Sequence, residues 1–287
     1  MRRLILLFLL SLPVSTPLWC QQPTASVNAS AELPDSPVPQ SDLTDDAGTE
    51  AVVNAPNRHG YPTDREESWK ALPKDFLHDQ KLIWAVFPKQ LAQGHHWIPV
   101  LLTAGATAGL LYADPHVMNY FRSHDKNLSD LNSTFNSGIS AVYIFSVPAG
   151  LLAAGYVRHD PYQVSTALLC AAAYGDSAIP PLAVKAIARR ERPSEVPLLT
   201  PFQDEFFKDS WYKGSSFPSG HAAAAFSVAT VVAHRYSNHK WVPVLAYGMA
   251  TAIGLSRVTG REHFPSDVFV GSVIGWATAK YATLRPR

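Results

Sequence analysis

Three clusters of polar residues interrupt the apolar second half of the sequence, and each contains side chains suited to binding an anion or moving a proton. In the first cluster, Lys185 precedes Arg192-Pro193 by seven residues, which is two turns of a helix. This spacing predicts that both cations share one helix face until the proline ends the helix. Taken alone, a basic helix end is more commonly a solvated surface or a membrane-flanking segment.

The second cluster, Phe217-Pro218-Ser219-Gly220-His221, stands immediately before an alanine-rich stretch. Its proline and serine are typical of a helix N-terminus, whose unpaired N–H groups and dipole attract an anion. Gly220 lets a ligand approach the backbone closely. A histidine in the first helical turn could donate a proton to a leaving oxygen. The alternative is a capped helix in which His221 has no chemical role.

The third cluster begins with Ser256-Arg257 and continues to His263, Pro265 and Asp267. Because a proline disfavours helical backbone at the residue before it, a new helix is predicted to begin at Pro265, with His263 in the loop before it. A carboxylate in the first turn can hold one imidazole nitrogen and leave the other available for attack. By itself, this cluster could equally be a charged surface loop.

In combination, the clusters form a three-part pattern. It reads Lys-x6-Arg-Pro, 24 residues, Pro-Ser-Gly-His, 34 residues, and then Ser-Arg-x5-His-x3-Asp. The pattern closely resembles the signature of the type 2 phosphatidic acid phosphatase and vanadium haloperoxidase superfamily, and every signature position is filled. The resemblance extends over about residues 138–281. Arg189 and Arg190 are alternatives to Arg192, but only Arg192 has the signature spacing and the following proline.

The resemblance implies an enzyme in which a histidine attacks phosphorus and forms a phosphohistidine that water then hydrolyses. His263 would be the nucleophile, Asp267 would orient it, and His221 would protonate the departing oxygen and later activate water. The phosphoryl oxygens would be held by three cations and a helix N-terminus, namely Lys185, Arg192, Arg257, Ser219 and the N–H of Gly220. Fixed cations suit a reaction dominated by positioning and charge stabilisation, so neither a metal nor another cofactor is expected.

The resemblance also implies the substrate class, a phosphomonoester or pyrophosphate carried on a small molecule or a lipid. Two alternatives stay open at this point. One is a vanadium-dependent haloperoxidase, and the other is a non-catalytic membrane scaffold that retains the pocket. The aromatic-rich segment 194–217 is predicted to border the pocket.

The elements that must position these clusters are predicted to be helices. Six apolar segments are rich in alanine and nearly free of strand-like alternation, which favours an all-α bundle of about six core helices. The segments are 97–112, 138–157, 162–188, 219–234, 241–257 and 265–281. Asp176 lies within one of them and is interpreted as a kink or a polar contact.

Composition excludes several other classes of protein. Charged residues make up 16% of the chain, below the roughly 25% of an ordinary soluble domain. The net charge of +1 gives no basic field for nucleic acid, so none is expected as a partner. Two cysteines are too few for a disulfide framework or a cysteine-rich zinc site.

The N-terminal part of the chain divides into three further segments. Residues 1–20 combine Arg2-Arg3 with a short apolar run and are interpreted as a signal peptide, which predicts export, in bacteria to the periplasm. Residues 21–60 contain five prolines and six acidic residues but no aromatic residue, as is typical of a disordered linker. Residues 61–96 are predicted to be an extension with short helices, followed by the phosphatase-like domain at 97–284.

Placement relative to a membrane is open from the sequence. Residues 131–157 are free of charge and exceed the roughly 20 residues that a bilayer requires, whereas 222–233 and 268–279 are charge-free for only 12 residues each. A signal peptide delivers the extension to the exported side. Six spanning helices with an exported site would instead leave the extension in the cytoplasm. The sequence interpretation therefore prefers an exported domain that is soluble or peripherally bound over an integral one.

Overall fold

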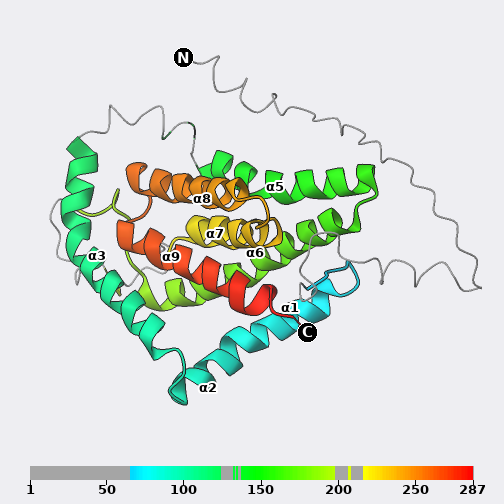
Figure 1. Ribbon diagram of the computed structural model, residues 1–287. Helices are drawn as coiled ribbons and strands as arrows, with labels where there is room; N and C mark the ends of the chain where they lie inside the picture. The colour runs from blue at the N-terminus through cyan, green and yellow to red at the C-terminus, as the bar shows by residue number, and fades with distance from the viewer. Residues whose placement is uncertain are drawn as a thin grey trace, which may run out of the picture. The chain divides into compact units, whose positions relative to one another are not determined.

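The computed structural model describes residues 65–123, 132, 134, 137–197, 206–207 and 216–286. Within these ranges the chain forms helices and turns and contains no strand, which confirms the all-α prediction (Figure 1). The predicted signal peptide and linker lie outside the described residues, and these two assignments stay predictions.

Six long helices carry the fold, and their bounds follow the apolar segments closely. They are α3 (Trp97–Ser123), α5 (Ser137–Arg158), α6 (Pro161–Ala188), α7 (Gly220–Arg235), α8 (Trp241–Thr259) and α9 (Pro265–Thr278). The largest departure is α3, which was expected to end near Tyr112 but continues through Asp114 and Pro115. Asp114 is fully buried and paired with Arg190, so tertiary contacts hold this stretch helical despite the proline.

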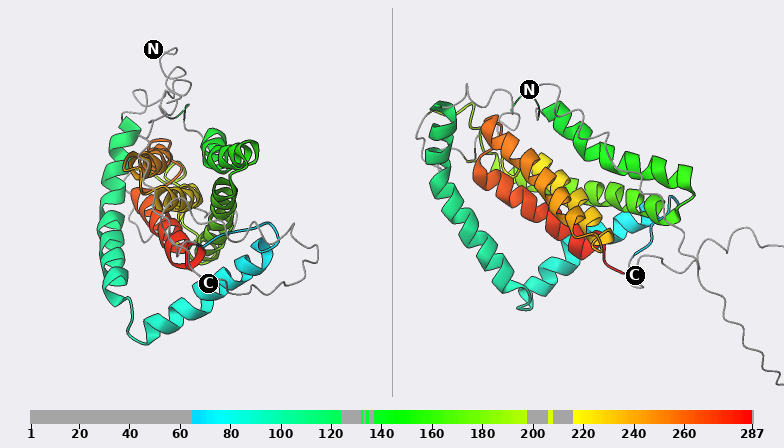
Figure 2. Two further views of the ribbon diagram at one scale, coloured as in Figure 1. Left: turned by 45° about the vertical axis from the view of Figure 1, so that its right-hand side comes forward. Right: turned by 45° about the horizontal axis from the view of Figure 1, so that its top comes forward.

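Helix α7 lies at the centre of the bundle, in contact with α6, α8 and α9 (Figures 1 and 2). Its contact with α9 is a direct approach of two backbones. A Cβ atom on Gly271 would lie 2.3 Å from the carbonyl oxygen of Ser219, and one on Gly275 would lie 2.0 Å from that of Ala223. Only glycine permits this spacing. The approach joins the two helix N-termini, where the N–H of Ser219 donates to the carbonyl of Asp267 at 2.9 Å.

The three polar clusters meet at one end of the bundle because the central helices alternate in direction. Helix α6 ends there, α7 begins there, α8 ends there and α9 begins there. At the opposite end, the start of α6 meets the end of α7, where the hydroxyl of Tyr162 donates to the carbonyl of Arg235 at 2.6 Å. Residues far apart in sequence are thereby assembled into a single site.

The predicted extension forms a continuous helical segment made of α1 (Leu72–Lys81), the π-helical turn η1 (Leu82–Val86) and α2 (Phe87–Ala92). It is attached to the bundle at the end opposite the polar clusters. Arg65 is buried, and it donates to Asp79 at 2.8 Å and to the carbonyl of Thr283 at 2.7 Å. Thr283 follows α9 in the π-helical turn η3 (Ala279–Thr283). The boundary between extension and domain stays a prediction.

Asp176 makes the polar contact that the sequence suggested. Its carboxylate accepts hydrogen bonds from Gln80 at 3.1 Å and from Thr283 at 2.9 Å. Cys170, on the same helix, is fully buried. Both residues therefore have structural roles at a distance from the polar clusters.

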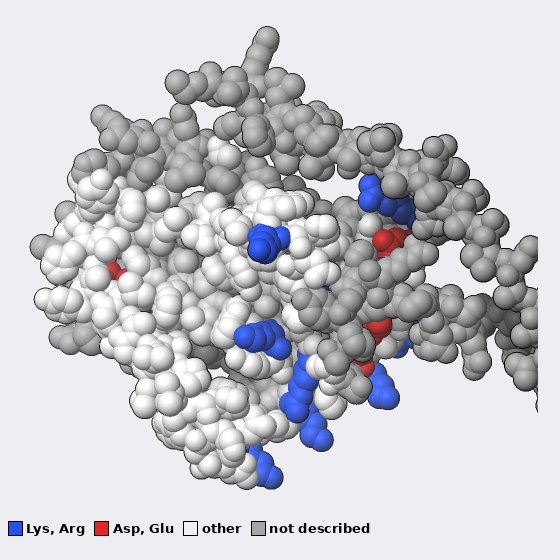
Figure 3. Space-filling model, viewed as in Figure 1, with Lys and Arg blue, Asp and Glu red and all other residues white. Residues whose placement is uncertain are grey.

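Within the part of the chain that the structure describes, four helices are long and apolar enough to cross a membrane: α3, α5, α6 and α8. Large apolar side chains are exposed along them, among them Leu102 on α3, Val142 on α5 and Val244 on α8. Figure 3 shows a face with few charged side chains over much of its area. Exposed apolar surface of this extent is typical of contact with lipid. The finding supports a membrane-associated protein.

Candidate active site

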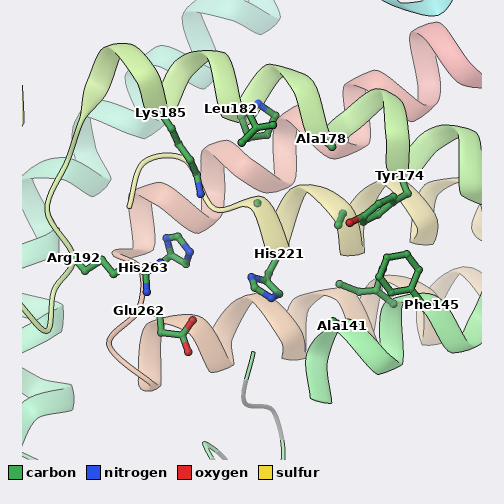
Figure 4. Close-up of a pocket in the computed structure, with 14 residues that line it drawn as sticks. Ala141, Phe145, Tyr174, Ala178, Leu182, Lys185, Arg192, His221, Glu262 and His263 are labelled. Carbon is green, nitrogen blue, oxygen red and sulfur yellow. The ribbon is translucent and has the colours of Figure 1, made fainter. Parts of the chain in front are cut away.

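A cavity of about 540 Å³ opens at the end of the bundle where the polar clusters meet. Five of the predicted site residues line it, namely Lys185, Arg192, Gly220, His221 and His263. Figure 4 shows both histidines directed into the same space as the two cations. Its other walls are mostly apolar and come from α5, α6 and α7.

Lys185 and Arg192 reach the cavity from different elements, so the prediction that they share a helix face is wrong. Helix α6 ends at Ala188, and Arg189 follows in the left-handed region at φ 42°. The N–H of Arg189 donates to the carbonyl of Lys185 at 3.0 Å and closes the helix there. Arg192 is therefore presented by the loop that follows, where the two cations converge through tertiary structure rather than through helical spacing.

The second cluster forms the N-terminus of α7 as predicted. The hydroxyl of Ser219 caps the helix by accepting from the N–H of Ala222 at 3.4 Å. Ser219 is fully buried and is not among the cavity residues, so its observed role is capping rather than ligand contact. A Cβ on Gly220 would lie 3.9 Å from Nζ of Lys185. The Lys185 ammonium therefore lies beside the helix N-terminus, so both would act on one bound anion.

His263 lies in the loop before α9 and Asp267 in its first turn, as predicted, but the contact between them differs from the expectation. Nδ1 of His263 lies 2.7 Å from the carbonyl oxygen of Ser216 and 3.6 Å from Oδ2 of Asp267. The same Oδ2 accepts from the N–H of Phe264 at 2.8 Å and from the Ser216 hydroxyl. The carbonyl of Ser216 therefore fixes the orientation of the His263 ring. Asp267 influences the ring through its negative charge rather than through a hydrogen bond.

Asp267 is held as a carboxylate. Burial by itself would raise the pKa of this group, but the charge of Arg190 and the hydrogen bonds around it bring the pKa below its ordinary value. Oδ1 accepts from Nη1 of Arg190 at 2.7 Å, and both side chains are fully buried. A permanent negative charge thus stands next to the imidazole of His263.

Arg257, the third predicted phosphate ligand, lies behind the cavity wall. Its side chain is buried, and Nη1 donates to both carboxylate oxygens of Glu262 at 3.2 and 3.3 Å. Nη2 donates to the hydroxyl of Ser140 at 3.2 Å. Glu262 lines the cavity whereas Arg257 does not. Glu262 therefore holds this arginine, and a bound phosphate would have to share it with that carboxylate.

Sequence reasoning missed several residues that build the site: Asp114, Arg190, Ser216, Glu262 and Ser266. Asp114 carried a usable signal, because a lone carboxylate inside an apolar helix is costly unless it is paired. Arg190 was weighed only as a substitute for Arg192. Ser216 carried no signal, because its contact with His263 uses the main-chain carbonyl.

The segment 194–217 was expected to border the cavity, and it is described only in part. Phe206 packs on Phe217 with ring centroids 5.8 Å apart, and the guanidinium of Arg190 lies 4.8 Å from the Phe206 ring. Neither aromatic ring is among the cavity residues. Phe202, Trp211 and Tyr212 lie outside the described residues.

Comparison with known proteins bears on residues 164–286, which match the PAP2 superfamily. The match covers less than half of the chain. All three polar clusters fall within it, so the resemblance inferred from them is confirmed. Helix α3, with Asp114, lies outside the matched residues.

Two named proteins are similar to parts of the chain. The lipid A 1-phosphatase of Porphyromonas gingivalis is 40% identical over 62 residues, which are 21% of this chain and 14% of that protein. The lipid A 4'-phosphatase of Helicobacter pylori is 39% identical over 77 residues, which are 27% of this chain and 36% of that protein. The chain thus spans well under half the length of either relative.

A solved structure was also found to be similar. It is the transmembrane PAP2 type phosphatidylglycerolphosphate phosphatase of Bacillus subtilis, at 22% identity and a TM-score of 0.43. The alignment covers 64% of this chain and 90% of that one.

Proposed function

We propose that this PAP2 protein is a phosphatase that hydrolyses a lipid-borne phosphomonoester or pyrophosphate through a phosphohistidine, with no metal in the reaction. The observation that carries the proposal is the composition of one cavity. Two histidines, two cations, the carboxylate of Glu262 and a helix N-terminus lie at one end of it, and the remaining walls are mostly apolar side chains. The polar end fits a phosphoryl group, and the apolar walls fit hydrocarbon.

The first step would form a bond between Nε2 of His263 and phosphorus while the bond from phosphorus to the leaving oxygen breaks. His221 would give its proton to that oxygen. Lys185, Arg192 and the N–H groups that open α7 would stabilise the charge on the phosphoryl oxygens. In the second step, water would attack phosphorus, pass a proton to His221 and release His263 and inorganic phosphate.

The lipid part of the proposal rests on where the apolar walls lie. Phe145 belongs to α5, and Tyr174 and Leu182 belong to α6; both helices are long enough to cross a membrane. Hydrocarbon attached to the phosphate would therefore contact the same helices that face lipid. The names of the two lipid A phosphatases support a phosphorylated lipid as the substrate class.

A substrate panel tests this function. The purified full-length protein would be assayed for phosphate release from lipid A, phosphatidate, phosphatidylglycerophosphate and a soluble aryl phosphate. We expect the lipids to be preferred and the His263→Ala variant to be inactive on all of them. Preference for the soluble ester would contradict the lipid assignment. Halide oxidation dependent on added vanadate and peroxide, without phosphate release, would support the haloperoxidase alternative.

We also propose that the catalytic end is exported. The basic and apolar N-terminus predicts export of the segment that follows it, and hence of the site only if α3 does not cross the membrane. Helix α3 begins at the end opposite the site and ends near it, where Arg122 donates to the carbonyl of Val196 at 2.6 Å. If α3 crosses the membrane, residues before Trp97 therefore lie on the opposite side from the site.

Labelling of introduced cysteines in intact cells tests the orientation. Glu195→Cys would mark the catalytic end and Lys240→Cys the opposite end, each in a chain whose own cysteines are replaced. An impermeant maleimide is expected to label position 195. Labelling of position 195 alone would mean that the bundle spans the membrane and that the N-terminal segment does not export the extension. Labelling of both positions would instead support a wholly exported, peripherally bound domain. Labelling of position 240 alone would contradict an exported site.

A further inference from the structure

Arg190 is not a signature position, and it lies behind the signature residue Asp267. Its side chain is completely buried, and its two terminal nitrogens reach opposite carboxylates. Nη1 donates to Asp267 at 2.7 Å, and Nη2 donates to Asp114 at 2.8 Å. The guanidinium plane stacks on Phe264 at 3.7 Å from the ring centroid. The arginine is therefore fixed by two ion pairs and an aromatic face.

Asp114 supplies the second anchor from a helix outside the matched family region. It is fully buried on α3, where Oδ1 accepts from the N–H of Ser266 at 3.1 Å. Its Oδ2 accepts from the hydroxyl of Ser266 as well as from Arg190. Ser266 immediately precedes Asp267 in the first turn of α9. Asp114 thus fixes both Arg190 and the turn that carries the site carboxylate.

Such an arrangement is a poor means of stabilising the fold alone. Removing three charged groups from water costs several kcal/mol per ion, and well-packed apolar residues often serve stability as well or better. The described geometry does, however, define the orientation of Asp267 completely. Its Oδ1 faces Arg190, and its Oδ2 faces the N–H of Phe264 and the Ser216 hydroxyl beside His263.

We propose that Asp114 and Arg190 are positioning residues for the nucleophile His263, acting through Asp267. The inference rests on the proposed phosphatase function, because it assumes that His263 becomes positively charged when its Nε2 binds phosphorus. Asp267 would stabilise that charge across the 3.6 Å to Nδ1. Arg190 would keep Asp267 ionised and aligned, and Asp114 would keep Arg190 in place.

The charged groups around Asp267 determine what removal of Arg190 would do. Arg190 follows α6, His263 precedes α9, Asp114 is on α3, and Lys185, on α6, is close enough to act on Asp267 through charge. Without Arg190, the carboxyl would be left fully buried beside a second buried carboxylate. Burial and the neighbouring carboxylate both favour the protonated form of Asp267. Asp267 would therefore bind a proton at a higher pH than in the wild type. A neutral Asp267 cannot stabilise a charged His263.

The experiment uses the full-length protein and an activated aryl phosphate, with kcat and KM measured from pH 4 to 9. Arg190→Gln is expected to lower kcat on the order of a hundredfold, with KM changed by less than about threefold. The acid limb of its kcat profile is expected to move to higher pH. Arg190→Lys, which keeps the charge, is expected to restore the position of the acid limb but only part of kcat.

Arg235 offers a matched control at the opposite end of the bundle. It is also buried, donates to Glu66 at 3.1 Å and lies over the Tyr162 ring at 3.7 Å. Arg235→Gln should lower thermal stability comparably while leaving the kcat of the folded protein and its pH profile at wild-type values. If Arg190→Gln behaves in the same way as Arg235→Gln, Arg190 is merely structural and the proposal is overturned.

Asp114→Asn keeps the test decisive if Arg190 variants do not fold, because it removes a charge without removing a heavy atom. We expect its kcat to fall by about tenfold or more, with little change in KM. A wild-type kcat and pH profile in this variant would overturn the role of Asp114. A wild-type protein that cleaves no phosphate ester would instead refute the proposed function, and this inference with it.

Discussion

Nδ1 of His263 lies 2.7 Å from the carbonyl oxygen of Ser216, and this contact decides which ring nitrogen can attack phosphorus. A carbonyl oxygen only accepts hydrogen bonds, so Nδ1 must carry the proton. Nε2 is then unprotonated in the neutral ring and available as the nucleophile. The main chain therefore performs the orienting role that a carboxylate performs in a Ser-His-Asp triad.

Ser216→Ala separates the backbone contact from the side-chain contact. The variant keeps the carbonyl that fixes His263 and loses only the hydroxyl that donates to Asp267. We expect kcat to fall by less than about tenfold, since one hydrogen bond of several is lost. Asp267→Asn should cost on the order of a hundredfold or more, because it removes the charge itself. Equal losses in the two variants, measured as initial rates, would contradict this division of roles.

His221→Ala should depend on the leaving group. The departing oxygen of an alkyl ester is strongly basic and needs a proton in the transition state, whereas an activated phenolate does not. The loss of kcat/KM is therefore expected to be larger on the lipid substrate than on the aryl phosphate. His263→Ala should abolish activity on both and prevent phosphoenzyme formation. Identical losses for both variants on both substrates would refute the assigned roles.

Vanadate should inhibit without any dependence on a divalent metal. Vanadate can adopt the five-coordinate geometry of phosphoryl transfer, with Nε2 of His263 at an axial position and Lys185 and Arg192 at the equatorial oxygens. Chelators should leave turnover intact, because protein cations supply the charge. Phosphatase activity that is abolished by chelation and restored by a divalent ion would contradict this metal-independent mechanism.

Gly275→Ala tests the backbone contact that brings α7 and α9 together. The added Cβ would lie 2.0 Å from the carbonyl oxygen of Ala223, so the helices must separate. We expect the free energy of unfolding to fall by at least about 1–3 kcal/mol and the activity to be reduced. Gly105→Ala is the matched control, since nothing lies within 4 Å of its added Cβ. Thermal unfolding in detergent should show a change below about 1 kcal/mol for this control.

The ion pair between Asp267 and Arg190 should give a defined pH dependence of stability. The pKa of Asp267 is lowered in the fold from the ordinary value of about 3.9. A group with a lowered folded pKa stabilises the protein above its unfolded value, and that stabilisation is lost as the pH falls through the folded pKa. The difference in melting temperature between the wild type and Asp267→Asn should therefore be constant from about pH 8 to 5 and shrink below about pH 4. A difference that already shrinks near pH 6 would contradict the lowered pKa.

The sequence by itself determined the helices and the chemical identity of the site. Apolar runs, alanine content and the lack of strand-like alternation are local features of the sequence. The six segments predicted from them therefore coincide with helices to within a few residues at most boundaries. Ser219 and Pro265 mark helix starts through local backbone chemistry, and the structure places both as expected. The spacing of the three clusters was enough to identify the superfamily.

Only the tertiary structure decided which of these residues touch. Lys185 and Arg192 converge because the helix ends at Ala188, whose carbonyl accepts from the N–H of Phe207 in the following loop at 2.9 Å. Asp114 and Arg190, 76 residues apart, pair only because α3 packs beside the start of α9. Ser216 reaches His263 with a carbonyl group that every residue possesses. Local sequence patterns determine helix periodicity and helix caps. Contacts between residues far apart in the chain depend on how the helices pack, and no short sequence motif specifies that packing.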